Sequence, residues 1–438
     1  MLRNTTAKFY QRILLKMSKT FCNLPWIQLY ISTSGNHRIC CNNNDNIPKD
    51  DGYYHFNMTR DKITDSWNSD YLKDMRLTLM KGEKHKNCQR CYLQEDLGHI
   101  SMRDTKNIDA LIKNTNADGS YDTPPWQLEL HFGNLCNLAC KMCSQNYSTT
   151  IGKEFLKMGE KDPDFLKWVK KESGTVNNWT GQLDMVYDWF KNEKVKKEVF
   201  EHVSKNITSL NVIGGEPTVI KEFFELLDYC YNENTLKDKD VLIHSNMTNI
   251  NPKLTQWLGE MKGWSIAASI DGIGDRNRYI RYPSDWDTIV KNINFYKTVI
   301  EKHGNGGISF GPAIQLLNID QLADLCMFFE DISPHSVSIG FYSHVKYPII
   351  CDYDIAPTDY KLQVADKLEA SVKKVHNKVY ASDIQTHING LRQETFTDEQ
   401  KKMYQKMFVR YNDTQDKLRG NTKTWRELLP NLEKSIGL

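Results

Sequence analysis

Leu128-Glu-Leu-His-Phe132, followed after three residues by Cys136-Asn-Leu-Ala-Cys140-Lys-Met-Cys143, is the most informative part of the sequence. The first segment alternates apolar and polar residues, which is typical of a β-strand. The second places three cysteines within eight residues, in a loop of the kind that carries active sites at the carboxyl ends of barrel strands. Thiolates suit iron–sulfur clusters or zinc, and the missing fourth local ligand leaves a coordination position open, as in catalytic metal sites.

Downstream of this loop, short apolar runs alternate with helical patterns. The expected strands are residues 127–132, 207–213, 241–245, 265–270, 308–316 and 337–342. Helical patterns separate them at 223–231, 253–261, 286–301 and 319–329. Such alternation predicts βαβ units with a parallel sheet. We therefore expect an α/β fold, a partial (β/α)6 TIM-like barrel, in which the charged segment 144–206 is an insertion that caps one side.

Further strand ends carry residues suited to a ligand at the same edge of the sheet. In Gly214-Gly215-Glu216-Pro217, the paired glycines let the backbone approach a ligand and the proline fixes the turn. Asn246 ends the third strand, and Ser269 and Asp271 in the fourth point to one side because they are two residues apart. Arg281 carries a guanidinium suited to a carboxylate. An ordinary strand-to-helix turn, a turn cap and a surface arginine are the alternatives.

Together these motifs resemble the radical S-adenosylmethionine (SAM) superfamily, whose C-x3-C-x2-C loop binds a [4Fe-4S] cluster. The resemblance implies that Cys136, Cys140 and Cys143 hold three irons, and that SAM at the fourth is cleaved to a 5′-deoxyadenosyl radical that abstracts hydrogen. Met142 stands where the superfamily usually has an aromatic residue, so adenine stacking is lost and only its backbone remains to meet the adenine. The other implied SAM contacts are Gly214, Gly215 and Glu216 with Pro217 at the amino group, Ser269 and Asp271 at the ribose, Asn246 beside them, and Arg281 at the carboxylate.

A second group of cysteines precedes the barrel. Cys22 and Cys40 have the spacing C-x12-G-x4-C, and Cys88-Gln-Arg-Cys91 supplies another pair. Four thiolates from two pairs make a closed site, for which ligand chemistry alone favours zinc. Cys22-Asn-Leu-Pro-Trp26 and the spacing resemble the twitch half of the SPASM/twitch auxiliary-cluster domains of radical SAM maturases, which implies a second iron–sulfur cluster. Cys41 is an alternative to Cys40 that the sequence leaves open.

Length and composition are those of a folded protein with several domains. The 438 residues suggest about three domains, and 39% hydrophobic residues supply a sizeable core. The pair Pro124–Pro125 indicates a boundary. We expect an amino-terminal extension at 1–19, a twitch-like domain at 20–124, the barrel at 125–350 and a helical carboxyl-terminal region at 351–438. The superfamily usually carries the auxiliary module after the barrel, whereas here it comes first.

Charge and hydropathy argue against several kinds of partner. The net charge is +2 and the first 20 residues contribute +5, so the rest carries −3. A slightly acidic body argues against duplex nucleic acid, because such binding needs a basic face. No apolar run is long enough for a membrane span, and the first residues do not resemble a secretory signal. Eleven cysteines without an export signal indicate metal binding rather than disulfides and predict a cytoplasmic protein.

The sequence thus predicts a radical SAM enzyme that acts on a peptide, a protein side chain or a small molecule, with flavodoxin or ferredoxin as electron donor. An auxiliary cluster would accept the electron left on the substrate, which favours an oxidation or a crosslink. Two alternatives stay open: a zinc docking domain at the front of such an enzyme, or a non-catalytic zinc or iron–sulfur protein of a larger assembly. No general base is assigned, and Glu129 and His131 are expected to form a hydrogen-bonded pair in the barrel lumen.

Overall fold

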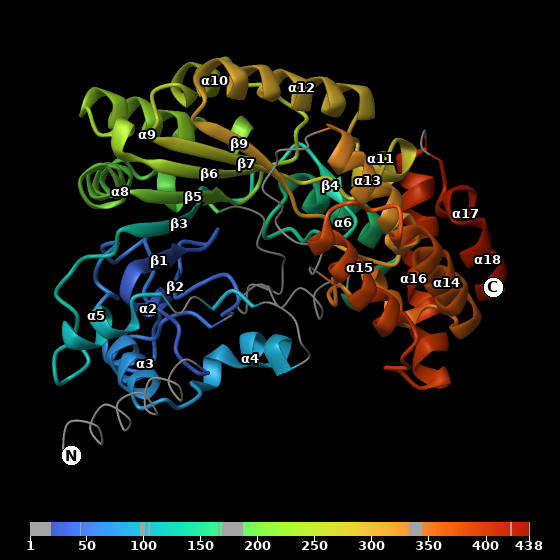
Figure 1. Cartoon of the computed structure of the whole chain (residues 1–438), viewed down its shortest axis with the longest axis horizontal. Helices are drawn as coiled ribbons and strands as arrows, with labels where there is room; N and C mark the ends of the chain where they lie inside the picture. Colours follow the sequence, from blue (N-terminus) through green and yellow to red (C-terminus); the bar gives the residue numbers. More distant parts are fainter. Residues whose placement is uncertain are drawn as a thin grey trace.

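The computed structural model describes residues 19–43, 45–96, 101–103, 106–164, 167–168, 187–332, 344–420 and 423–437. Within these residues, the central sheet has seven strands in the order β2-β1-β3-β5-β6-β7-β9 (Figure 1). Neighbouring strands pair in parallel, except that the edge strand β2 is antiparallel to β1. The strands are β1 (Gln28–Ile31), β2 (His37–Arg38), β3 (Gln127–His131), β5 (Ser209–Ile213), β6 (Asp240–Ser245), β7 (Gly263–Ala268) and β9 (Gly306–Phe310).

One face of this sheet is apolar because the strands alternate in register. Each residue of its central row is at most 1% exposed, and burial stabilises each by roughly 1.5–3 kcal/mol relative to exposure. The opposite face carries polar residues such as Glu129 and Asn211, which pair in register, and it forms the barrel lumen. The apolar row consists of Leu130, Val212, Ile243, Ile266 and Ile308.

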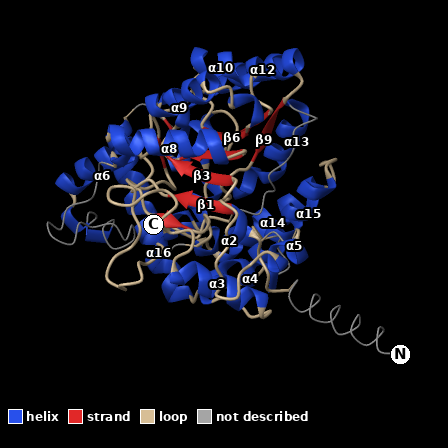
Figure 2. Ribbon diagram, turned by 90° about the vertical axis from the view of Figure 1, so that its left-hand side faces the viewer, coloured by secondary structure: helices blue, strands red, loops and turns tan. Residues whose placement is uncertain are grey.

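The predicted alternation of strands and helices is confirmed between β3 and α13. The barrel helices are α6 (Thr149–Lys161), α8 (Glu193–Asn206), α9 (Lys221–Asn232), α10 (Pro252–Leu258), α11 (Asp275–Ile280), α12 (Trp286–His303) and α13 (Leu322–Ile332). Figure 2 shows the strands between α9, α10 and α12 on one side and α2, α3 and α4 on the other. Five of the predicted strands are confirmed with shifted ends, and the one at 337–342 lies outside the described residues.

The predicted domain boundary near residue 124 falls between two paired strands. β1 pairs in parallel with β3, from Gln28 opposite Gln127 to Ile31 opposite Leu130. The amino-terminal region therefore extends the barrel sheet by β1 and β2 instead of docking as a separate unit. Its helices are α2 (Leu24–Ile27), α3 (Asp70–Met80), α4 (Gln89–Asp96) and α5 (Ile108–Lys113).

The carboxyl-terminal region is helical, as predicted, and its last helices lie beside α11 and α13 (Figure 1). Its longest helix, α16, ends at Gly420, which has a φ of +63°. No helix in the described ranges combines the length and the apolar composition that crossing a bilayer requires. The helices are α14 (Thr358–Val372), α15 (Lys378–Leu391), α16 (Asp398–Arg419), α17 (Trp425–Leu428) and α18 (Pro430–Ile436).

Candidate metal and cofactor site

The three cysteines after β3 lie in what we call the cysteine loop, residues 132–143, at the carboxyl end of that strand. Part of the loop forms β4 (Ala139–Cys140), which pairs antiparallel with β8 (Arg281–Tyr282). This pairing sets Cys140 opposite Arg281. Cys140 is buried, whereas Cys136 and Cys143 are partly exposed. The loop thus places its three cysteines at the edge of the sheet where parallel α/β folds place ligands.

The first turn of α6 holds this loop in place. Ser148 donates from Oγ to the Leu138 carbonyl at 2.6 Å, and Thr150 donates from Oγ1 to the Cys136 carbonyl at 2.6 Å. Ser148 Oγ also accepts the Ile151 N–H at 3.2 Å and so caps the helix. The first turn of α6 therefore holds the cysteine loop at two points, Cys136 and Leu138.

The three thiols lie close enough to influence one another's ionisation. Burial raises the pKa of Cys136 to about 12, and the charge of Cys140 adds to this rise. Burial also raises the pKa of Cys143, with smaller contributions from Cys140 and Cys136. Without metal, the thiols are therefore protonated near neutral pH, and a metal centre has to displace these protons when it binds.

The glycine pair at the end of β5 lies directly against the cysteine loop. Gly214 and Gly215 have φ values of +92° and +54°, and a Cβ at Gly215 would lie 2.0 Å from the Leu135 carbonyl oxygen. The Glu216 N–H donates to the same oxygen at 2.8 Å. Pro217 then starts a 3-10 helix (Pro217–Val219). The glycine pair thus permits a close approach of two backbone segments, its own turn and the cysteine loop, and the approach to a ligand stays a prediction.

The buried carboxylate of Glu216 joins the ends of β5 and β6. It accepts hydrogen bonds from Ser245 Oγ at 3.0 Å and from the Asn246 N–H at 2.6 Å, both at the end of β6. Thr218 donates to it from its backbone N–H and its Oγ1. Asn246 Nδ2 in turn donates to Asn137 Oδ1 in the cysteine loop at 2.9 Å. The Glu216 side chain therefore holds the ends of β5 and β6 together, and its own N–H and the Asn246 side chain connect them to the cysteine loop.

Asp271 and Arg281, expected at the ribose and the carboxylate of SAM, form one ion pair. Arg281 Nε lies 2.7 Å from Asp271 Oδ2, and the Asp271 side chain is fully buried. Asp271 Oδ1 also accepts the Ala313 N–H at 2.8 Å. Burial lowers the pKa of Arg281, but the charges of Asp271 and Cys140 outweigh it and raise the value. Asp271 thus fixes the guanidinium of Arg281 beside the cysteine loop.

Ser269 and Met142 occupy half-buried positions around this edge. The predicted fourth strand, 265–270, was placed two residues too far along the chain, because β7 is Gly263–Ala268 and Ser269 lies in the loop after it. Strand alternation therefore does not govern the directions of Ser269 and Asp271. The Ser269 N–H donates to the Ser245 carbonyl at 2.8 Å, and Met142 packs at the margin of the core.

The barrel lumen holds a polar group next to the cysteine loop. His131 Nε2 lies 3.3 Å from Glu129 Oε1, and both residues are buried, so the predicted hydrogen-bonded pair is confirmed. The His131 ring centroid lies 4.9 Å from that of Tyr30 on β1 and 6.3 Å from that of Tyr147. Burial lowers the pKa of His244 on β6 to about 4, which leaves this imidazole neutral. These polar and aromatic side chains therefore connect β1, which carries Tyr30, with the segment after the cysteine loop, which carries Tyr147.

The four predicted cysteines of the amino-terminal region line one pocket, which we call the amino-terminal pocket. They come from four elements, because Cys22 precedes α2, Cys40 follows β2, Cys88 ends a 3-10 helix (Lys86–Cys88) and Cys91 lies in α4. Burial raises the pKa of both Cys40 and Cys88 to about 12, and the charge of Cys22 adds to both. Tertiary folding therefore gathers thiols that are far apart in the sequence.

Cys41 is exposed and does not line this pocket. The structure thus distinguishes two neighbouring cysteines between which the sequence could not choose. Asn42 Nδ2 lies 3.3 Å from Cys91 Sγ, and Arg103 also lines the pocket. The Arg103 guanidinium is held by Glu95, at 2.6 Å from Nη2 to Oε2. Sequence analysis missed both Asn42 and Arg103, because neither belongs to a cysteine motif.

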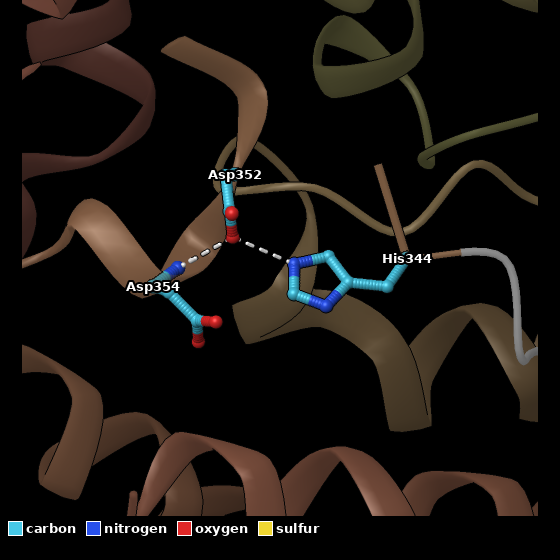
Figure 3. A group of neighbouring side chains, drawn as sticks. All are labelled: His344, Asp352 and Asp354. Carbon is cyan, nitrogen blue, oxygen red and sulfur yellow. Dashed lines mark hydrogen bonds and ion pairs between the residues drawn. The ribbon is translucent and has the colours of Figure 1, made fainter. Parts of the chain in front are cut away.

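A third polar cluster, remote from both cysteine sites in sequence, consists of His344, Asp352 and Asp354 (Figure 3). Their ligand atoms lie within 4.8 Å of one another, and no other three histidine, cysteine or acidic residues in the described part of the chain meet this criterion. Lys346 Nζ lies 3.4 Å from Asp352 and 2.6 Å from Asp354, and His344 stacks on Tyr353 at 3.7 Å. Because Lys346 and the His344 ring already occupy these carboxylates, we interpret the cluster as a structural brace.

Two family models match the chain. The radical SAM superfamily matches residues 130–326, and the SPASM iron–sulfur cluster-binding domain matches residues 22–92. No curated protein matches. Streptococcus suis SuiB bound to S-adenosylmethionine is similar with 13% identity and a TM-score of 0.33, over 67% of this chain and 59% of that chain. SuiB bound to precursor peptide SuiA is similar with 13% identity and a TM-score of 0.32, over 67% and 60%.

The parallel sheet and its two groups of gathered thiols define an α/β metalloprotein. The chain carries a radical SAM domain over residues 130–326 and a SPASM iron–sulfur domain ahead of it. The cofactors of these two domains are a [4Fe-4S] cluster and SAM in the radical SAM domain and an additional cluster in the SPASM domain. The family, fold and cofactors expected from the sequence are confirmed. The chain spans 59% of the SuiB chain.

Proposed function

We propose that the cysteine loop binds the SAM cluster and that the amino-terminal pocket binds the auxiliary cluster. The support is that the cysteine loop, the glycine turn after β5 and the Arg281–Asp271 pair all meet at one end of the sheet. Mutual effects on thiol pKa values further support a shared centre. The proposed ligands are Cys136, Cys140 and Cys143 for the SAM cluster, and Cys22, Cys40, Cys88 and Cys91 for the auxiliary cluster.

The thiols of neither site are gathered as closely as they would be around a single zinc ion. A tetrahedral zinc ion with Zn–S bonds of about 2.3 Å holds its sulfurs about 3.8 Å apart. No three cysteines in the described ranges have sulfurs within 4.8 Å of one another. In a cubane each sulfur binds a different iron, so the sulfurs stand farther apart than around a single ion. The donor sets therefore fit the cofactors that the family implies.

When bound, the cluster and SAM supply a one-electron cleavage of the sulfonium that yields the 5′-deoxyadenosyl radical. The residues of the chain bind, orient and shield these groups. Burial raises the pKa of Cys140, and the charge of Arg281 opposes this rise and so favours the thiolate ligand. We assign SAM contacts to Met142, Gly214, Gly215, Glu216, Pro217, Asn246, Ser269, Asp271 and Arg281. Through Glu216, a single buried carboxylate keeps several of these backbone segments together.

We infer that the substrate is a peptide or protein side chain that enters the lumen between the two cysteine sites. Tyr30, Glu129, His131 and Tyr147 surround this region and belong to elements from both sites. The closed auxiliary site is suited to accept an electron from the substrate after hydrogen abstraction. A small iron–sulfur or flavin protein, ferredoxin or flavodoxin, would donate the first electron, and the cytoplasm would provide the reducing setting.

Anaerobic reconstitution with iron and sulfide, followed by SAM and dithionite, tests this function. Two cubanes predict about eight irons per chain, whereas a zinc module predicts about four irons and one zinc. 5′-Deoxyadenosine should form in the wild type and in a Cys41→Ser control. Its absence from a fully iron-loaded chain would overturn the proposed activity. Transfer of deuterium from labelled candidate peptides into 5′-deoxyadenosine then identifies the substrate.

A further inference from the structure

Helix α16 lies outside both family-model matches, yet its second half packs against the cysteine loop. Its buried residues recur every three or four positions, so they form one face of the helix. Most of that face is polar, and buried polar groups require specific partners. The buried residues from its second half are Phe408, Tyr411, Asn412, Gln415 and Arg419.

Lys141, between the second and third cysteines of the triad, is the central partner of this face. Its side chain is 0% exposed, and Nζ donates to Asn412 Oδ1 at 3.0 Å. The same ammonium lies 3.9 Å from Asp416 Oδ1 and 4.0 Å from the Tyr279 ring centroid. The Tyr279 hydroxyl donates to Asn412 Oδ1 at 3.0 Å. A lysine in the cysteine motif is thus held by a helix 271 residues away in the sequence.

Arg419, at the end of α16, holds the other side of Cys140. It donates from Nη2 to the Ala139 carbonyl at 2.7 Å, and it pairs with Glu154 of α6 at 3.0 Å. Its guanidinium lies over the Tyr282 ring of β8 at 4.4 Å. Only 2% of its side chain is exposed. One residue of α16 therefore connects β4, β8 and α6, the three elements that frame the loop.

We propose that Asn412 and Arg419 are positioning residues for the SAM cluster, which they orient through Lys141 and Ala139 on either side of Cys140. This inference rests on the proposed assignment of that cluster to the triad. Without α16, the backbone here would keep the β4–β8 pairing and the bond from Lys141 N–H to the Ile280 carbonyl at 2.8 Å. The helix adds the side-chain contacts that those backbone bonds lack.

The contacts of α16 with the cysteine loop are expected to affect the electrostatics of the cluster site as well as its geometry. Arg419 brings a positive charge to the buried side of the loop, where charges interact more strongly than in water. Such a charge favours the more negative, reduced state of a nearby cluster. Weaker positioning also misaligns the open iron and SAM, and small displacements of reacting groups reduce rates strongly. The helix is therefore expected to affect both the potential of the cluster and the turnover of SAM.

The test uses full-length variants with a matched control on the same helix. Asn412→Leu removes the acceptor for Lys141, and Arg419→Met removes the bond to Ala139. The control, Arg410→Gln, breaks an exposed pair with Asp162 at 2.7 Å that also links α16 to the end of α6. Arg410 makes none of the contacts with the cysteine loop described above. Asn412→Asp is the conservative partner, because it keeps the acceptor for Lys141 and adds a negative charge.

In the metal-free chain, hydrogen exchange of the amides at 136–143 should rise about tenfold in Asn412→Leu and Arg419→Met and stay unchanged in Arg410→Gln. After iron loading, both variants should change the response of the electron paramagnetic resonance signal to SAM and lower kcat. The midpoint potential should become more negative in Arg419→Met, which loses a buried positive charge. The exchange measurement needs no cluster. A wild type that binds no iron would therefore refute the proposed function, while the exchange would still report on the contact.

Exchange rates and spectra equal to the wild type in folded Asn412→Leu and Arg419→Met chains would overturn the proposal. An equal rise of exchange in Arg410→Gln would do the same. If the two variants do not fold, Asn412→Asp decides. Its exchange should match the wild type while its midpoint potential becomes more negative, and an unchanged potential contradicts the proposed role.

Discussion

The two cysteine sites are built in opposite ways. The triad comes from eight consecutive residues after one strand, whereas the amino-terminal pocket takes four cysteines from four elements between residues 22 and 91. A single loop can present its ligands once its ends are held, but a dispersed site exists only after the whole module has folded. The first site therefore depends on the contacts that hold one loop in place, whereas the second depends on the folding of the whole amino-terminal region.

The sites also share one electrostatic device. Arg281 beside the triad is held by Asp271, and Arg103 on the amino-terminal pocket is held by Glu95. In each case the carboxylate fixes an arginine near buried thiols, whose pKa values burial raises. A fixed positive charge favours thiolate ligands without binding the metal itself. An arginine fixed by a carboxylate is therefore found at both the cysteine loop and the amino-terminal pocket.

The largest expected effect separates the two sites by function. Cys140→Ala should abolish 5′-deoxyadenosine formation and remove about four irons per chain, because the triad has no spare ligand. Cys88→Ala should also remove about four irons but leave SAM cleavage measurable. Iron analysis and chromatography of the nucleoside check both. Cleavage by Cys140→Ala at the wild-type rate would refute the assignment of the triad.

The next effect concerns neighbours within the amino-terminal pocket. Cys40→Ser should lose about four irons, because Cys40 lines the pocket with the other three cysteines. Cys41→Ser should keep the full iron content, since Cys41 is exposed outside that lining. The two variants change the same atom at adjacent positions and are matched controls for each other. Equal losses in both would show that the pocket rearranges when the cluster binds.

A smaller effect is expected where the glycine turn meets the cysteine loop. Gly215→Ala should lower the free energy of unfolding by about 3 kcal/mol or more, because its Cβ would lie 2.0 Å from a carbonyl oxygen. Gly274→Ala is the control, because Gly274 also has a positive φ but has open space around its Cβ position. Its cost should be about 1–2 kcal/mol from backbone strain alone. Urea denaturation compares the two, and equal costs would mean that the close approach is unimportant.

The smallest effect is a pH dependence of the amino-terminal region. Burial lowers the pKa of His37 to about 4, below its ordinary value of 6.5. Between these values the unfolded chain binds a proton that the folded chain does not. The stabilisation is therefore complete above pH 6.5, is lost as the pH falls, and levels off near pH 4. By pH 5 the loss is about 2 kcal/mol.

Denaturation at pH 7 and pH 5 measures this loss. His37→Gln should show a smaller difference between the two pH values than the wild type. His376→Gln, at an exposed position, should keep the wild-type difference. If all three chains lose the same stability, His37 does not contribute to acid sensitivity.

Much of the barrel and the triad could be predicted because their signals are local. The alternation of Leu128-Glu-Leu-His-Phe132 predicted β3, and the cysteine spacing predicted a metal loop after it. The predictions failed where a strand end depended on its neighbours, as at Ala268, where β7 stops before Ser269. They also missed the pairing of β1 with β3, because a four-residue strand carries too weak a pattern to reveal its partner.

Short-range periodicity thus predicted the order of the barrel elements. The resemblance of the cysteine and glycine motifs to the radical SAM superfamily implied the family and the candidate ligands of both clusters. Packing alone distinguished Cys40 from Cys41, paired Arg281 with Asp271 and brought Asn412 to Lys141. The physical reason is distance along the chain. Spacing within a motif constrains neighbouring atoms directly, whereas contacts across many residues depend on how whole strands and helices bury their surfaces against one another.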